Sequence, residues 1–449
     1  MQIQDTIVAI ATPVGVGGIG IIRLSGPKAF VIAKEMAPNF KKMPRYLQYV
    51  GLFESKEERL LDNICAVYCI SPHSYTGEDV VELHLHASPY LLQKVLDLCV
   101  DFGARLAEPG EFTKQAFLNG KMNLIQAESV VDLINAQTDS EHHMALSHYQ
   151  GHLYGHIVKL RQVLLDSLAH LQASIDFPDE VDPLPRSELK KGLENGIEAL
   201  ARIVKFQDFG VLIQEGIPGV IVGKPNVGKS SLFNALLGEN KAIVSAIAGT
   251  TRDVLEARLQ LNGLRFIIQD TAGLHDTKDY IEHLGIKKVK EKIKKAQLVF
   301  WVLDGARPFD EEDFLVYQKI KRKKQLYLLV NKSDQKQRLK LPESIKKLHP
   351  CFFISMKTKA GLQEFKQAVG ILFRKTFDEA DVNLLCNIRQ IHCVKQVLKK
   401  LKQIDIDTVL DDLLCIDLKA LVLKLGELTG DDLTEEVLDN IFSRFCVGK

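Results

Sequence analysis

The sequence predicts a multidomain protein with an α+β N-terminal domain, an α-helical bundle and an α/β domain inserted into the bundle. Two observations predict this layout. Apolar residues recur at steps of three and four on both sides of a central segment, whereas the central segment alternates short apolar strands with amphipathic helices. Each helical half alone would expose an apolar face, so one shared bundle is the simplest arrangement. A chain of 449 residues, 46% hydrophobic, can bury the several cores that this layout needs.

The N-terminal part, residues 1–119, is expected to form the α+β domain. Residues 19–24 and 80–85 are short runs of the kind that form strands, and residues 91–100 have the period of an amphipathic helix. From Leu124 onward the pattern becomes helical. The first domain boundary is therefore expected at residue 119.

Two flanking segments, residues 120–213 and 374–449, are expected to form the helical bundle. Apolar stripes lie on both sides of residues 176–185, where three prolines forbid a continuous helix. Helical stripes resume after the central domain. The stripes comprise Ile157, Leu160, Leu164, Leu168, Leu171 and Ile175, then Leu189, Leu193, Ile197, Leu200 and Val204, and finally Ile391, Val394, Leu398, Leu401, Leu414, Leu418, Leu421, Leu425 and Leu428.

The central segment, residues 214–373, carries the pattern Gly-x-x-x-x-Gly-Lys-Ser at residues 223–230. An apolar run at residues 219–222 precedes the pattern and a helical pattern at residues 231–237 follows it. Glycines let successive backbone N–H groups surround phosphate oxygens, and the helix N-terminus adds partial positive charge. Lys229 can reach the β- and γ-phosphates, while the Ser230 hydroxyl can ligate magnesium. The segment is therefore predicted to be an α/β domain with a phosphate-binding loop.

Three further motifs follow at strand ends, in the order that a GTP-binding domain requires. Asp-Thr-Ala-Gly at residues 270–273 supplies an aspartate that holds magnesium through water and a glycine N–H that senses the γ-phosphate. Asn-Lys-Ser-Asp at residues 331–334 supplies the Asp334 carboxylate, which can accept two hydrogen bonds that guanine donates and adenine cannot. Ser-Met-Lys at residues 355–357 fits the loop that meets guanine O6 through a backbone N–H. Together, the four motifs predict a GTPase.

The residues expected to hydrolyse GTP differ from those of many small GTPases. Leu274, directly after the aspartate motif, cannot orient water as a glutamine would. Thr251, in the segment between the phosphate loop and Asp270, is the expected ligand of magnesium and of the γ-phosphate. Asn226 offers a neutral oxygen where a monovalent cation could bridge phosphates, in place of an arginine finger.

Beyond these motifs, the whole chain resembles the MnmE (TrmE) family of tRNA-modifying GTPases. The strings that carry the resemblance lie outside any general requirement for nucleotide binding, at residues 5–9, 17–26, 75–82, 109–113, 116–121 and, as Phe-Cys-Val-Gly-Lys, 445–449. The resemblance implies that the N-terminal domain has a folate-binding-like fold and forms a homodimer. Residues 84–89, His-Leu-His-Ala-Ser-Pro, depart from a family pattern richer in glycine, and Glu256 and His275 stand where some relatives carry arginine.

The resemblance also implies GTP hydrolysis stimulated by potassium as two GTP-bound domains meet. Asn226, Thr250 and carbonyl groups near Ser245 and Ile247 would be the potassium ligands. Glu282 matches the family's water-orienting glutamate, whereas the residues alone favour a solvated position at a helix start. The residues expected to contact GTP are Asn226, Val227, Gly228, Lys229, Ser230, Ser231, Ser245, Ala246, Ile247, Ala248, Gly249, Thr250, Thr251, Asp270, Thr271, Ala272, Gly273, Asn331, Lys332, Asp334, Ser355 and Met356.

The resemblance also implies that the substrate of the modification reaction is tRNA. With a FAD-containing partner, MnmG, in a heterotetramer or larger complex, the family adds an aminomethyl or carboxymethylaminomethyl group to C5 of wobble uridine in certain tRNAs. The one-carbon unit comes from a tetrahydrofolate in its 5-formyl or 5,10-methylene form. Arg23, Glu82, Lys121 and Lys449 are the expected folate contacts, although each alone fits an ordinary surface charge.

Composition excludes some other classes. The net charge is +1, so no global basic field draws the chain to nucleic acid, and lysine clusters at residues 287–295, 319–324 and 399–402 fit solvated helix faces better than tRNA contacts. The eight cysteines lack Cys-x-x-Cys spacing, and neither a signal segment nor a membrane-length apolar run is evident. A cytoplasmic protein with reduced thiols is expected. Cys446 fits a buried hydrophobe under a C-terminal helix better than a nucleophile.

Two other functions fit part of these data. One is a ribosome-assembly GTPase that binds RNA, although such proteins usually add a basic RNA-binding module. The other is a folate-binding scaffold with a vestigial GTPase domain, against which the intact Lys229, Ser230, Thr251, Asp270 and Asp334 argue. Folate binding distinguishes the tRNA-modifying function from the first alternative, and GTP turnover distinguishes it from the second.

Overall fold

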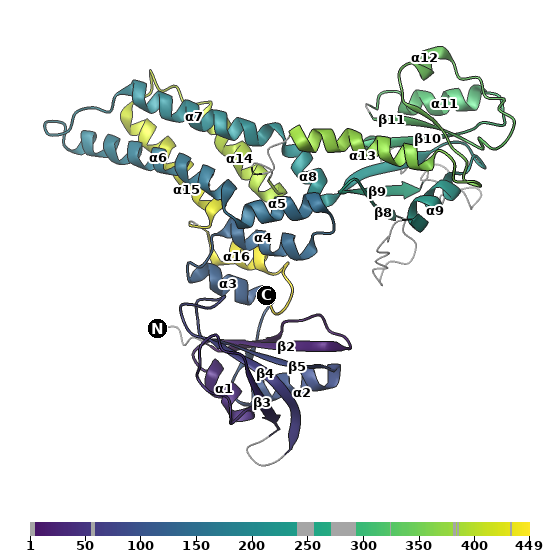
Figure 1. Ribbon diagram of the computed structural model, residues 1–449. Helices are drawn as coiled ribbons and strands as arrows, with labels where there is room; N and C mark the ends of the chain where they lie inside the picture. Colours follow the sequence, from purple (N-terminus) through teal and green to yellow (C-terminus); the bar gives the residue numbers. More distant parts are fainter. Residues whose placement is uncertain are drawn as a thin grey trace, which may run out of the picture. The chain divides into compact units, whose positions relative to one another are not determined.

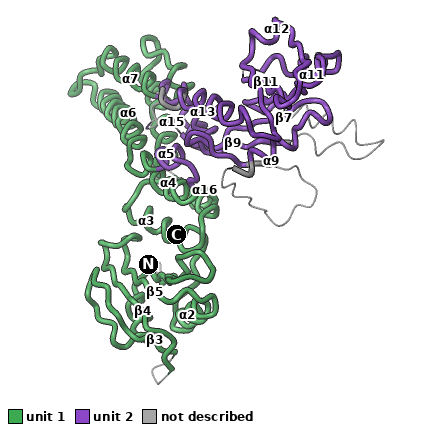
Figure 2. Tube along the Cα trace, turned by 45° about the vertical axis from the view of Figure 1, so that its right-hand side comes forward, with its two compact units in different colours: residues 1–135, 146–199, 395–449 green, residues 136–145, 200–394 purple. Residues whose placement is uncertain are grey.

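The computed structural model describes residues 5–54, 59–239, 256–270, 293–323, 325–379, 383, 386–431 and 433–449 (Figure 1). The backbone divides into two compact units, which Figure 2 shows in different colours. Unit 1 comprises residues 1–135, 146–199 and 395–449, and unit 2 comprises residues 136–145 and 200–394. The finer boundaries that we place at residues 119, 213 and 373 stay predictions.

The N-terminal part of unit 1 is a six-stranded sheet with helices on one face, as the mixed pattern predicts. The sheet order is β3-β4-β5-β2-β1-β6, antiparallel except for the pair β1–β6. Side chains alternate along β4 and β5, so one face packs against α1 and α2 and the other is only half-buried. The elements are β1 (Ile7–Ile10), β2 (Gly17–Ser25), α1 (Ala29–Met36), β3 (Gln48–Phe53), β4 (Leu60–Cys69), β5 (Val80–Ala87), α2 (Pro89–Asp101) and β6 (Arg105–Leu106).

Helices form the rest of unit 1. The predicted helix break at the prolines is confirmed, because α6 (His152–Asp176) ends where the break begins and α7 (Arg186–Lys205) starts after it. α6 packs along α15 (Asp411–Thr429), so apolar stripes from before and after the central segment share one core. The other helices in or bordering this unit are α3 (Glu111–Leu118), α4 (Leu124–Asn135), α5 (Asp139–Tyr149), α14 (Ile388–Leu401) and α16 (Glu435–Phe442).

Unit 2 is built on a second six-stranded sheet, in the order β12-β11-β10-β7-β9-β8. All neighbours are parallel except β8 and β9, which confirms the mostly parallel sheet predicted for this segment. β10 and β11 are buried along their whole lengths, because helices cover both faces of the sheet. The elements are α8 (Gln207–Glu215), β7 (Ile217–Val222), α9 (Lys229–Glu239), β8 (Glu256–Leu261), β9 (Leu264–Asp270), β10 (Leu298–Asp304), α11 (Glu311–Ile320), β11 (Leu326–Asn331), α12 (Glu343–Lys346), β12 (Cys351–Phe353) and α13 (Leu362–Glu379).

In the part of the chain that the structure describes, none of the helices combines the length and the apolar character needed to span a bilayer.

Candidate functional site

The phosphate-binding loop connects β7 to α9. Three of its residues have a left-handed backbone, with φ of 152° at Gly223, 62° at Asn226 and 102° at Gly228. A Cβ at Gly223 would collide with the Val302 carbonyl oxygen, and a Cβ at Gly228 with the Asn331 amide group. Glycine is therefore required at both of these positions of the loop.

Lys229 is the first residue of α9 and is only 6% exposed. Its Nζ donates a hydrogen bond to the Lys224 carbonyl oxygen at 2.7 Å, which holds the ammonium group across the loop. Ser230 and Ser231 follow on the exposed first turn of the same helix. A buried cation beside a glycine-rich loop at a helix N-terminus has the charge to hold a polyphosphate.

Asn331 joins the phosphate loop to the loop after β12. Its Nδ2 donates to the Val227 carbonyl oxygen at 2.9 Å, and its Oδ1 accepts from the Met356 backbone N–H at 3.2 Å. Asn331 is 3% exposed, so these bonds are shielded from water. The phosphate loop and two segments more than 100 residues further along the chain are thereby held together at the carboxyl edge of the parallel sheet, where ligands of such sheets bind.

Asp334 and Lys332 complete this edge. The Ser355 Oγ donates to Asp334 Oδ1 at 2.7 Å, and this hydrogen bond is the main cause that lowers the pKa of the exposed Asp334 carboxyl. The carboxylate is therefore ionised near neutral pH, the state that can accept two hydrogen bonds from a guanine. Lys332 has φ of 64°, and its Nζ lies 2.6 Å from Asp304 Oδ2 at the end of β10.

The two segments expected to move with the nucleotide, the switch segments at residues 246–253 and 273–282, lie outside the described residues. Asp270 ends β9 and pairs in register with Ile221 of β7, beside the phosphate loop, and only its backbone is described. The predicted site residues outside the described part are Ser245, Ala246, Ile247, Ala248, Gly249, Thr250, Thr251, Thr271, Ala272, Gly273 and Glu282.

A second charged cluster lies on the half-buried face of the N-terminal sheet. Arg23 on β2 and Glu82 on β5 are opposite each other in register, and both Nε and Nη2 of Arg23 lie 2.8 Å from Glu82 Oε1. The Arg23 guanidinium carbon lies 5.6 Å from the ring centroid of Tyr75 and 5.7 Å from that of Phe112. The cluster therefore combines ionic and aromatic surfaces.

His84 belongs to the same cluster. Its Nε2 lies 3.4 Å from Glu82 Oε2, because residues two apart on a strand face the same side. The hydrogen bond from His84 and the charge and hydrogen bond of Arg23 outweigh burial and lower the pKa of Glu82 to about 2. The sequence analysis named His84 only as part of a segment that departs from a family pattern at its glycines, and the alternation along residues 80–87 was the signal that could have placed it here.

The C-terminal residues reach this cluster. Arg23 Nη1 donates to the Gly448 carbonyl oxygen at 3.2 Å, and Lys449 Nζ lies 6.0 Å from the Tyr75 ring centroid. Burial, together with the nearby Arg23, lowers the pKa of Lys449. The structure thus brings together Arg23, Glu82 and Lys449, whereas the Lys121 ammonium group is exposed and binds the Pro72 carbonyl oxygen at 3.0 Å.

The expectation that Cys446 is buried is wrong. Its side chain is exposed, because α16 ends at Phe442 and the next side chain to turn inward is that of Phe445, whose ring centroid lies 5.0 Å from that of Phe442. The Cys446 carbonyl oxygen accepts from the Gly110 N–H at 3.3 Å, which ties the tail to the N-terminal domain.

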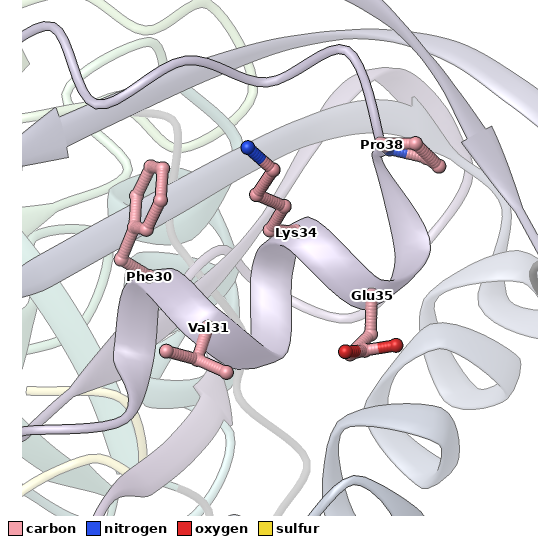
Figure 3. A pocket seen from close by; sticks show the side chains of 5 residues that line it. All are labelled: Phe30, Val31, Lys34, Glu35 and Pro38. Atoms are coloured by element: carbon pink, nitrogen blue, oxygen red, sulfur yellow. The ribbon is translucent and has the colours of Figure 1, made fainter.

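A pocket of about 510 Å³ lies along one side of α1 (Figure 3). Phe30, Val31, Lys34, Glu35 and Pro38 line it, and Lys34 and Glu35 point in opposite directions. None of these five residues belongs to either charged site.

Comparison with known proteins identifies the family. A family model described as the MnmE helical domain matches residues 124–446, and one described as the GTP-binding protein TrmE N-terminus matches residues 6–121. The chain belongs to the MnmE family. It is 40% identical over 452 residues to the tRNA modification GTPase MnmE of Aquifex aeolicus, with 99% of this chain and 100% of the relative covered. The Thermotoga maritima protein of the same name is 40% identical over 459 residues, with 99% of this chain and 100% of the relative covered.

Among solved structures, the G domain of the Thermotoga maritima FeoB iron transporter is 26% identical and covers 35% of this chain and 98% of that chain, with a TM-score of 0.28. The four nucleotide-binding motifs and the membership of this family together identify a GTPase.

Proposed function

We propose that this GTPase acts in tRNA modification and, with the FAD-dependent partner MnmG, adds an aminomethyl or carboxymethylaminomethyl group to C5 of wobble uridine in certain tRNAs. The observation that carries the proposal is the presence, in one chain, of a guanine nucleotide edge and a separate charged, aromatic cluster. A general GTPase has no need of the second cluster. A homodimer in the cytoplasm is part of the same proposal, as are the domain boundaries predicted above.

GTP would occupy the carboxyl edge of the parallel sheet. Lys229 and the loop N–H groups bind its phosphates, and Asp334 and the Met356 N–H bind its guanine. The exposed Ser230 hydroxyl on the first turn of α9 suits a magnesium ligand, which Thr251 would complement. Bound magnesium neutralises charge that develops on the phosphates.

Potassium would be held by Asn226, Thr250 and the carbonyl groups of Ser245 and Ile247. The Asn226 side chain is exposed on a left-handed loop residue, so its oxygen is accessible to a cation beside the phosphates. Potassium there would supply the positive charge that an arginine finger supplies in other GTPases. Glu282 would orient the attacking water when two GTP-bound domains meet.

A tetrahydrofolate derivative, 5-formyl or 5,10-methylene, would bind the N-terminal cluster. Arg23 and Lys449 are cations within 6.0 Å of the Tyr75 ring, an arrangement that suits a flat heteroaromatic ring with a carboxylate tail. Lys121 would reach the tail from the neighbouring loop. The folate supplies the one-carbon unit when bound, while Arg23, Glu82 and His84 fix its orientation.

The test of this function is the nucleoside content of tRNA. Bulk tRNA from cells lacking the protein, with and without re-expression, is digested and its wobble uridines are quantified by mass spectrometry. We expect the C5-substituted nucleosides to disappear and to return with the wild-type protein but not with Asp270→Ala. Asp166→Ala, which removes an exposed carboxylate from α6, serves as the control and restores them.

Unchanged nucleosides in cells lacking the protein would contradict the proposal. Ribosome assembly with RNA binding would then be the better function, and ribosome profiles of the same cells would test it. A rate of GTP hydrolysis that is equal in potassium and in sodium would contradict the potassium part alone.

A further inference from the structure

Three helices, α5, α7 and α14, continue from one compact unit into the other within the described chain. In α5 the division falls between Ala145 and Leu146, so its first half belongs to unit 2 and its second half to unit 1. Because a helix is a continuous hydrogen-bonded rod, movement of one half is passed to the other. α5 also contacts the strands of the GTPase sheet that lead to the nucleotide end.

Glu141 in the first half of α5 is held against β9. Its side chain is 8% exposed, and its Oε1 lies 3.0 Å from Nε of Arg265, which is 17% exposed. The other oxygen, Oε2, accepts from the Gln137 N–H at 2.7 Å, and the Glu141 N–H donates to Thr138 Oγ1 at 3.3 Å. The ion pair therefore joins β9 to the start of α5.

The turn between β8 and β9 holds the same helix. Asn262 and Gly263 have φ of 49° and 77°, the left-handed pair of a tight hairpin turn. The Gly263 carbonyl oxygen accepts from the Ser140 N–H at 3.3 Å. Met144, one turn further along α5, is 3% exposed and packs in the core that includes Leu264 and Phe266 of β9. Polar and apolar contacts thus fix the first half of α5 to the closed end of the hairpin.

The open end of this hairpin is the nucleotide end. β9 ends at Asp270, directly before the aspartate motif, and β8 begins at Glu256, directly after the segment that carries Thr251. The seven residues of β9 span roughly 20 Å at the usual rise of a strand. β8 is the edge strand of the sheet, so only one neighbour restrains the hairpin on that side. β9 is thus the strand that joins Asp270 at the nucleotide end to Arg265 near the closed end of the hairpin.

We propose that the Glu141–Arg265 pair couples the nucleotide state at Asp270 to unit 1, through the β8–β9 hairpin and the continuous helix α5. The two residues are positioning residues and touch no substrate. The inference rests on the proposed function only where it extends to tRNA, since unit 1 contains the cluster proposed to bind folate. When the ion pair is intact, tRNA modification depends on the nucleotide state. When it is broken, GTP is still hydrolysed but modification is no longer coupled to hydrolysis.

The test compares amide hydrogen exchange in the full-length protein with GDP and with a non-hydrolysable GTP analogue. In the wild type we expect peptides covering residues 140–149 to exchange at different rates in the two states. In Glu141→Gln and in Arg265→Gln this difference disappears, while the GTP hydrolysis rate is unchanged. The double variant Glu141→Arg with Arg265→Glu restores an ion pair of opposite orientation. We expect it also to restore the difference in exchange rate between the two nucleotide states.

His143→Gln is the matched control, because it changes an exposed side chain on the same helix. It should leave the exchange difference intact. In cells, Glu141→Gln is expected to lower the C5-substituted wobble uridines at least about fivefold, the lower end of ordinary coupling between two sites. Thermal unfolding of each variant separates this effect from loss of fold.

A nucleotide-dependent difference in exchange that persists at full size in Glu141→Gln and Arg265→Gln would overturn the inference. This readout contains no tRNA, so it is independent of the test of the proposed function. Should Asp270→Ala restore the nucleosides while exchange behaves as expected, the proposed function falls and the coupling stands.

Discussion

In the described part of the chain, two six-stranded sheets present their candidate functional groups in different ways. In the parallel sheet of unit 2, the groups lie on loops at the carboxyl ends of strands, and backbone atoms make many of the contacts. In the antiparallel sheet of unit 1, the groups are side chains on a face, brought together by strand register and by the C-terminal tail. The first site depends on local backbone geometry, and the second on long-range pairing of side chains.

This difference predicts how each site responds to substitution. A nucleotide site that relies on one buried cation should lose activity almost completely when that cation is removed. A face of paired side chains should respond more gradually, through local stability and the orientation of its ligand.

Lys229→Ala should have the largest effect. The Lys229 side chain is buried and its ammonium group lies against the phosphate loop, so its removal deletes a cation that would contact the phosphates. We expect the rate of GTP hydrolysis to fall by about 10²–10³-fold, while folate binding to unit 1 is unchanged. Phosphate release and isothermal titration measure the two quantities. The exposed Lys347→Ala is the control, and a loss of folate binding in Lys229→Ala would show that the sites are not separable.

Asp334→Asn should change the choice of base. The ionised carboxylate accepts from guanine N–H groups, whereas an amide offers a donor that suits the additional oxygen of xanthine. We expect the affinity for GTP to fall by about 10²-fold and the affinity for xanthosine triphosphate to rise. Competition binding with both nucleotides measures the two affinities. An equal loss of both affinities would mean that Asp334 supports the loop and does not contact the base.

Glu82→Gln should destabilise unit 1 in a pH-dependent way. The folded-state pKa of about 2 is lower than the ordinary 4.5, so the carboxylate stabilises the fold above pH 4.5 and this contribution is lost as the pH falls towards 2. At neutral pH we expect a loss of roughly 2–3 kcal/mol. Circular dichroism during urea unfolding at several pH values measures the free energy of unfolding. The difference in this free energy between the variant and the wild type should become smaller as the pH falls.

The single tryptophan gives this prediction an internal control. Trp301 is buried in β10 of unit 2, so its fluorescence reports the unfolding of the GTPase sheet. In Glu82→Gln the urea concentration at the midpoint of the fluorescence transition should be the same as in the wild type. An equal shift of the tryptophan transition would show that the two sheets unfold together.

The smallest effect is expected from blocking Cys446. The exposed Cys446 thiol should react with iodoacetamide, whereas burial raises the pKa of Cys99 to about 12 and protects it. Peptide mass spectrometry identifies the labelled residue. GTP hydrolysis should be unchanged, because Cys446 lies in unit 1. Faster labelling of Cys99 would contradict the packing of α2 against the N-terminal sheet.

The sequence predicted the nucleotide edge more fully than the N-terminal cluster, for a physical reason. The phosphate loop demands glycine at particular backbone torsions, and Gly223 and Gly228 meet that demand within six residues of each other. The apolar stripes of the helices and the break at the prolines could also be predicted. Both depend on local properties of the sequence, namely the spacing of apolar residues and the missing backbone N–H of proline. Asn331 was placed in the site by its motif, but its bridge between Val227 and Met356 required the fold.

The N-terminal cluster depends on contacts that no local pattern encodes. Arg23 meets Glu82 through strand register and meets Gly448 across almost the whole chain, so only the family resemblance pointed to these residues. Cys446 illustrates the same limit. Whether Cys446 or Phe445 turns inward depends on how α16 ends, and one residue of rotation decides it.

The central claim is that a GTPase and a separate one-carbon site in unit 1 serve one reaction. The most direct test is the wobble-uridine content of tRNA in cells that carry Arg23→Met together with Glu82→Gln, which removes the ion pair without leaving a lone charge. We predict wild-type GTP hydrolysis, an unchanged far-ultraviolet dichroism spectrum, and C5-substituted nucleosides as low as in cells lacking the protein. C5-substituted nucleosides at the wild-type level would contradict the account.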